Sequence, residues 1–197
     1  FLQSVFNDNK FRKNFGEELE AGYAIGGLVL RPYVDTKTNK IKISFCRADT
    51  FYPLQSNTND ISEAAIATIT QQTEGKKNVY YTLLEFHEWE NSTYYIRNEL
   101  YRSEEQSQTG VRVPLPTLDK YKELKEETAL VGFTRPLFVY IKLAGKNNIE
   151  IDSPLSLGII DNAKRQLIDI NEKYDEFMNE VEEARRKILA SDHFFKV

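Results

Sequence analysis

The apolar residues of the C-terminal region repeat at alternating steps of three and four residues, and this repeat constrains the fold more than any other feature of the sequence. Such a heptad pattern is typical of a helix that packs along its length against another element. A helix from Asp161 to Ala190 would be about 45 Å long. A sheet domain of this size needs less than that to cover its core. The repeat comprises Ile160, Ala163, Leu167, Ile170, Tyr174, Phe177, Val181, Ala184 and Ile188.

The repeat allows two interpretations. The helix lies on its own sheet, or it packs against copies of itself and forms an oligomer interface. Its start is also open, because Ser153 followed by Pro154 is a good N-cap with proline at the first helical position. Asp161 offers a second start if Gly158 interrupts the helix.

Upstream of this helix the sequence is rich in aromatic residues, with 11 Tyr and 12 Phe, which favours β-structure. The pattern predicts an N-terminal helix ended by Gly22, a hairpin, a three-stranded meander, a charged segment that forms a short solvent-facing helix or an excursion, and a further strand. We expect these at residues 2–21, at 24–34 with 41–45, at 61–73 with 79–90 and 93–101, at 118–130 and at 136–143. The predicted fold is α+β with a mixed or antiparallel sheet, divided into residues 1–152 and the helical residues 153–197.

The two ends of the chain are apolar. The sequence begins at Phe1 without a methionine and ends with Phe194-Phe195-Lys196-Val197. Such ends are expected where a longer chain has been cut. We therefore expect a fragment of a larger protein.

Composition excludes several classes of function. The chain has 26 Lys and Arg against 30 Asp and Glu, a net charge of −4, whereas tight sequence-independent binding to nucleic acid needs an excess of positive charge. Cys46 is the only cysteine and there are two histidines, which excludes an intrachain disulfide and a Cys- or His-rich metal site. No run of about 18 apolar residues is present, so no membrane span is expected. We expect no cofactor.

Glu85 and His87 form the one pair of side chains that suggests chemistry. They lie two residues apart on a predicted strand and therefore project from the same face. A carboxylate beside an imidazole can ligate a metal or transfer a proton. No third residue joins them in the sequence, and no phosphate-binding loop or nucleophile elbow is present. We favour a cross-strand polar cluster on a half-exposed sheet.

Several short segments occur in the order and spacing of one known family. They are Pro136-Leu137-Phe138, Lys146-Asn147-Asn148, Ile151-Asp152-Ser153-Pro154-Leu155, Asn162-Ala163 and Tyr174-Asp175-Glu176-Phe177, with residues 22–35, 48–53 and 81–87 upstream. Together they resemble portal proteins of tailed bacteriophages, in the branch common in phages of Gram-positive bacteria. The sequence departs from the family pattern at Asn171, where the family usually has Asp, and at Ser156, where it has Gly.

The resemblance implies a structural role without catalytic activity. Portal proteins form a ring, usually a dodecamer, at one capsid vertex of the virion. The ring nucleates head assembly in the host cytoplasm, together with scaffold and capsid proteins. The terminase motor packages duplex DNA through its channel, which does not bind the DNA tightly, and head-to-tail adaptor proteins bind later.

The resemblance also assigns roles to the parts of the chain. The heptad helix would be a stem helix whose seam packs against neighbouring subunits, and residues 1–152 would belong to wing- and clip-like regions. Some polar residues of the helix are candidates to face the lumen or a neighbour, namely Asp161, Lys164, Arg165 and Asn171.

Two alternatives stay open. The chain is a phage-encoded metal-dependent nucleic-acid enzyme with its site around Glu85 and His87, or it is a generic self-associating scaffold. In a scaffold the heptad seam would hold a dimer or trimer without a DNA channel.

Overall fold

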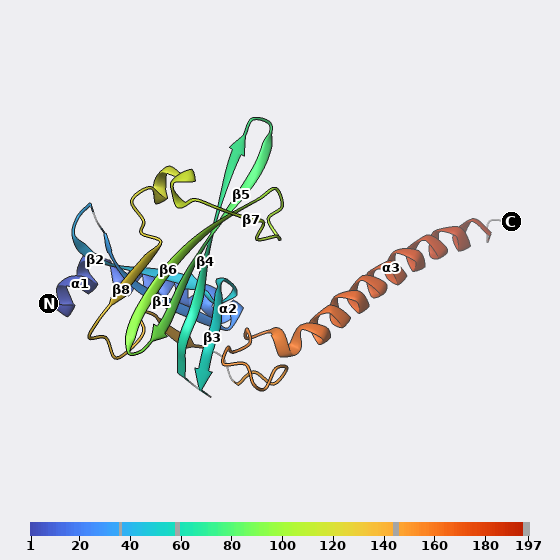
Figure 1. The fold of residues 1–197 in the computed structure, drawn as a ribbon. Coiled ribbons are helices and arrows are strands. Elements are labelled where there is room, and N and C mark those ends of the chain that lie inside the picture. Colours follow the sequence, from blue (N-terminus) through green and yellow to red (C-terminus); the bar gives the residue numbers. More distant parts are fainter. Residues whose placement is uncertain (36, 58–59, 144–145, 195–197) are drawn as a thin grey trace. The chain divides into compact units, whose positions relative to one another are not determined.

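The computed structural model describes residues 1–35, 37–57, 60–143 and 146–194, with side chains of the long helix up to residue 184 (Figure 1). The chain divides into two compact units, Phe1–Ile159 and Ile160–Val197. The first unit combines N-terminal helices with two sheets, and the second is one long helix after a short 3₁₀ turn. This confirms the α+β class. All strand pairs in the described residues are antiparallel. The division at residue 152 into wing- or clip-like and stem-like parts stays a prediction.

The N-terminal segment forms two helices, α1 (Leu2–Asp8) and α2 (Phe11–Ile25). They are separated at Lys10, whose backbone is left-handed with φ of 47°. The prediction of one continuous helix was therefore wrong. The side chain of Asn9 occupies the break, where it donates a hydrogen bond to the carbonyl of Ile41 and ties the break to a neighbouring strand.

Gly26, and not the predicted Gly22, ends α2. Gly26 has φ of 98°, a conformation that glycine adopts readily because it has no Cβ. Gly22 is buried within the last turns of the helix, where a Cβ would overlap the side chain of Leu143. Its small size therefore serves packing, and the helix continues past it.

A three-stranded sheet has the order β2-β1-β9. The predicted hairpin is confirmed, because β1 and β2 pair from Leu28 with Arg47 to Asp35 with Lys40. The last predicted strand is also present but shorter, because it pairs with only the first four residues of β1. The strands are β1 (Gly27–Asp35), β2 (Lys40–Arg47) and β9 (Val139–Lys142).

A six-stranded sheet has the order β3-β4-β5-β6-β7, and β8 pairs with β6 beside β7. The predicted meander is confirmed as β4, β5 and β6, which are long and joined by tight turns. The strands are β3 (Phe51–Asn57), β4 (Asp60–Glu74), β5 (Lys77–Glu90), β6 (Thr93–Ser103), β7 (Val111–Val113) and β8 (Glu127–Leu130).

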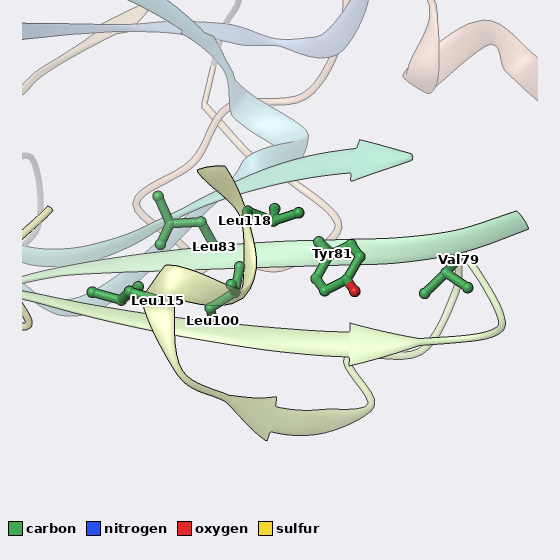
Figure 2. Close-up of a cluster of buried hydrophobic side chains, with 6 residues drawn as sticks. All are labelled: Val79, Tyr81, Leu83, Leu100, Leu115 and Leu118. Atoms are coloured by element: carbon green, nitrogen blue, oxygen red, sulfur yellow. The ribbon is translucent and has the colours of Figure 1, made fainter. Parts of the chain in front are cut away.

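The charged segment after β7 covers one face of this sheet. We expected a short solvent-facing helix or an irregular excursion at residues 118–130. The segment forms two 3₁₀ turns, Leu115–Thr117 and Asp119–Tyr121, followed by β8, so the helical alternative was wrong. Leu115 and Leu118 anchor this segment to the sheet, because both are buried against β5 and β6 (Figure 2). Packing of two leucines thus overrides the helical tendency. The cluster in Figure 2 comprises Val79, Tyr81, Leu83, Leu100, Leu115 and Leu118.

A second buried cluster joins the two sheets. Val29 comes from β1, Phe51 from β3, and Phe138 from the residues just before β9. The Phe51 and Phe138 rings meet edge to face, with 5.3 Å between their centroids. The two sheets therefore share one core.

The long helix is α3 (Lys164–Phe194), preceded by the 3₁₀ turn Asp161–Ala163. The alternative start at Asp161 is confirmed, and the start at Ser153 was wrong. Ser153 lies in a turn instead, where its hydroxyl accepts a hydrogen bond from the amide of Leu155. Among the described residues, no helix combines the length and the apolar content needed to cross a bilayer.

Candidate functional site

The apolar seam of α3 is exposed in the single chain. Its large side chains from Ile160 to Phe177 keep between 44% and 62% of their surface accessible, and Ala163 and Ala184 are exposed too. Only Val181 is half-buried among the seam residues whose side chains are described. Ile188 lies outside the described side chains, as do Arg185, Arg186 and Lys187. The unit that holds the seam therefore buries none of it completely.

Two further apolar residues of α3 lie outside the heptad positions. Ile168 and Met178 are also exposed. Met178 lies four residues after Tyr174 and three before Val181, so it borders the seam. Ile168 follows Leu167 by one residue and lies about 100° around the helix from it, off the seam. A heptad count misses them because it follows only two of the seven positions, whereas their apolar side chains in a polar helix were a visible signal.

The polar candidates on the helix fall on different sides of it. Lys164 and Asn171 lie three residues before and four residues after Leu167, on the side of the seam. Arg165 lies two residues before Leu167 and thus on the opposite side. All three are exposed, while Asp161 is half-buried in the 3₁₀ turn. A role toward the lumen or a neighbour stays a prediction for these four.

Glu85 and His87 occupy the buried face of β5. They are 4% and 1% exposed, because alternate residues of this strand point into the core. The expectation of a half-exposed polar cluster was wrong in this respect. The pattern of β5 did place both side chains on one face, together with Tyr81 and Leu83. The sequence did not reveal which of the two faces is covered.

Arg31 and Tyr94 complete a buried network around this pair. The guanidinium of Arg31, on β1, donates to both carboxylate oxygens of Glu85. His87 Nε2 lies 2.7 Å from Glu85 Oε1, and His87 Nδ1 lies 2.6 Å from the hydroxyl of Tyr94 on β6. The amide of Leu137 donates to the Tyr94 hydroxyl over 2.9 Å.

One hydrogen assignment gives every donor of this network an acceptor. His87 donates from Nε2 to Glu85, and its Nδ1 accepts the hydroxyl proton of Tyr94, which makes the imidazole neutral. Burial opposes ionisation of Glu85, but the hydrogen bond from His87 and the charge of Arg31 outweigh it and hold the pKa of Glu85 below its ordinary value. Burial raises the pKa of Tyr94. The network is therefore one carboxylate-guanidinium pair extended by neutral groups.

A groove of about 660 Å³ runs between the two sheets and the 3₁₀ segment, and Arg31 and Glu85 line it. Its lining mixes acidic side chains such as Asp119 with basic ones such as Lys120, so it carries no strong charge of one sign. Cys46 also lines the groove, and burial raises the pKa of its thiol. Within the described ranges, no three His, Cys, Asp or Glu side chains form a group that could hold a metal ion.

The family model of the phage portal proteins of SPP1 Gp6-like type matches residues 1–196. The chain belongs to this family. Portal proteins are structural components of the bacteriophage capsid that serve genome packaging, and the family forms oligomeric rings at the capsid vertex that associate with capsid and terminase. A comparison with curated proteins gives no significant match. The resemblance of the short segments to portal proteins is therefore confirmed over the whole chain.

The exposed face of α3 and the buried network around Glu85 differ in their surroundings. The apolar face of α3 is exposed. The Arg31–Glu85–His87–Tyr94 network is buried and connects the sheets, which is what a structural cluster does.

Proposed function

We propose that α3 is the stem helix of the portal ring and that its apolar seam packs against the neighbouring subunits around the DNA channel. The observation that carries this proposal is the exposure of Leu167, Ile170, Tyr174 and Phe177 on a single helix face. An apolar stripe of this length is unfavourable in water, and burial against another helix removes it from solvent. A heptad spacing suits such helix-helix contact.

The polar candidates on α3 lie on different sides of the helix and would therefore have different roles. Lys164 and Asn171 border the seam and would reach a neighbouring subunit. Arg165 lies on the far side of the helix and would face the lumen or the rest of the ring. The net charge of −4 favours a channel in which duplex DNA slides without tight binding.

The remaining roles follow from the same assembly. The intact ring would be a dodecamer with head-to-tail interfaces that close. It would dock the terminase motor during packaging and the head-to-tail adaptor proteins afterwards, and it would be assembled with scaffold and capsid proteins in the host cytoplasm. Residues 1–152 would form wing- or clip-like parts outside the stem.

Negative-stain electron microscopy of the full-length protein tests this proposal. We expect rings with a central hole wide enough for duplex DNA. Discrete small particles at all concentrations would contradict it. A dimer or trimer without a hole would favour the self-associating scaffold.

No observation favours the metal-dependent enzyme. Both carboxylate oxygens of Glu85 accept hydrogen bonds from Arg31, and Oε1 also contacts His87, so the carboxylate is engaged in the buried network. A cleavage assay on duplex DNA with Mg²⁺ or Mn²⁺ checks this directly. Cleavage by the parent protein that is lost in Glu85→Ala would revive the enzyme hypothesis.

A further inference from the structure

Where the six-stranded sheet extends past the end of β3, the described residues leave two strand edges open, one on β4 and one on β7. β3 pairs with β4 only as far as Ile66, and from there to Glu74 the described strands pair with β4 on its β5 side alone. On the opposite side of the sheet, β6 is the one described strand that pairs with β7. We call residues Thr68–Glu74 the β4 edge and Val111–Val113 the β7 edge. Figure 1 shows the β4–β5 hairpin extending past the end of β3.

The two edges lie level with each other, at the same position along the strand direction. Thr70 pairs with Tyr81, Tyr81 with Arg102, and Arg102 with Val111. The same row-by-row reading places Ile69 level with Arg112. At this position the sheet therefore consists of four strands, β4, β5, β6 and β7, with an open edge at each end.

The direction of the strands makes these edges complementary between copies. Four antiparallel strands alternate in direction, so β7 runs opposite to β4. A second copy in the same orientation, placed alongside the first, brings its β7 edge antiparallel to the β4 edge. An odd number of strands would have produced a parallel contact, which is slightly less stable. All subunits of a closed ring share this head-to-tail relationship.

The β4 edge also lacks the features that normally block pairing. Natural edge strands carry proline, charged side chains or bulges that prevent association. β3 has them, since it contains Pro53 and register shifts next to it. The β4 edge has no proline, and Glu74 at its end is its one charged residue. Ile69 on this edge and Val111 on the other are both exposed.

We propose that the β4 edge of each subunit pairs antiparallel with the β7 edge of the next subunit, so that the sheets form a second continuous contact around the ring. The occupant of each edge is thus another copy of this chain. This inference rests on the proposed ring and adds to the stem-helix contact an interface built from backbone hydrogen bonds.

Disulfide cross-linking in the full-length protein tests the pairing. On a Cys46→Ser background, Ile69→Cys combined with Arg112→Cys places two thiols level with each other on the same face. Directly opposite residues of an antiparallel pair have Cα atoms about 4.5–5.5 Å apart, which a disulfide bridges. Within one subunit, two intervening strands separate these residues by roughly 14 Å, so no intrachain disulfide forms.

The matched control combines Thr70→Cys with Arg112→Cys. Thr70 is one residue further along and points to the opposite face of the sheet. We expect a ladder of dimers and larger multiples on a non-reducing gel from the Ile69 pair, its loss on reduction, and no ladder from the Thr70 pair. A ladder from Gln71→Cys with Arg112→Cys would support the same edge pairing at a register shifted by two residues.

Three results would overturn the inference in distinguishable ways. Rings that are visible by electron microscopy but give no ladder from the Ile69 or the Gln71 pair exclude the edge contact and leave the stem-helix ring standing. A full-length protein that forms no rings overturns both proposals. Equal ladders from the Ile69 and Thr70 pairs would mean random collision, and would also exclude the edge contact.

Discussion

Arg31 on β1 binds both carboxylate oxygens of Glu85 on β5, so that one ion pair connects the two sheets across 54 positions of sequence. The carboxylate is almost completely buried and the guanidinium largely so. The two charges thus satisfy each other away from water. The relative position of the two sheets therefore depends on this ion pair. The local sequence of β1 or of β5 does not predict it.

Loss of the cation should destabilise the protein strongly. In Arg31→Met the Glu85 carboxylate keeps His87 but loses its counter-charge, and breaking a buried pair in this way costs about 3–5 kcal/mol. Urea denaturation measures the free energy of unfolding. As a control, Lys77→Met breaks an exposed pair with Glu104, which should cost no more than about 1 kcal/mol. Equal losses in the two variants would show that the Arg31 pair contributes little.

The same pair should make stability depend on pH in the acid range. The pKa of Glu85 in the folded protein lies below its ordinary value of 4.5, so the unfolded chain takes up the proton first as the pH falls. The contribution is therefore complete above about pH 5 and is lost as the pH falls through the folded-state pKa. Unfolding measured from pH 6 to pH 3 should show a shallower decline in Glu85→Gln. An unchanged pH profile in that variant would assign the acid sensitivity to other carboxylates.

Removal of the Tyr94 hydroxyl should destabilise the protein even when the aromatic ring is kept. Tyr94→Phe keeps the aromatic packing but leaves the amide of Leu137 and Nδ1 of His87 without their buried partner. Such unsatisfied groups cost about 1–3 kcal/mol. Tyr95→Phe is the matched control on the same strand, because that side chain is half-buried and its ring contacts Arg97. Thermal unfolding should separate the two variants, and a similar melting temperature for both would argue against the network.

Two glycines, one within α2 and one directly after it, should respond oppositely to alanine. In Gly26→Ala the new Cβ would overlap the backbone of Ser156 and Leu157 at a positive φ, and we expect a loss of more than about 2 kcal/mol. In Gly16→Ala the Cβ meets no atom within 4 Å, and helix propensity predicts a gain of up to about 1 kcal/mol. Chemical denaturation of both proteins checks the signs. A stable Gly26→Ala protein would mean that the 156–157 segment moves freely away.

Assembly should depend on the seam rather than on apolar surface in general. Leu167→Asp places a charge in the centre of the seam, and we expect it to dissociate the ring of the full-length protein. Ile168→Asp introduces the same charge on the neighbouring exposed residue, off the seam, and should leave the ring intact. Light scattering after size-exclusion chromatography measures both masses. Intact rings in Leu167→Asp would exclude the seam as the subunit contact.

The elements with long, regular patterns were predictable from the sequence. The alternation in β5 placed Glu85 and His87 on one face, and the heptad spacing placed the seam residues on one side of α3. Predictions were wrong where the local structure depends on a residue far away in the sequence. The end of α2 lies at Gly26 and not at Gly22 because the carbonyl of Gly26 and its αL backbone meet Ser156, which is 130 residues away.

The sequence by itself determined the periodicities, because these follow from backbone geometry: strand alternation, helix stripes, turns and the family to which the chain belongs. Only the tertiary structure decided which face is buried and which edges stay open. Arg31 meets Glu85 because the two sheets share one core, and the β4 and β7 edges lie level because three registers add up across the sheet. Such relationships join residues far apart in the chain, and no local pattern encodes them.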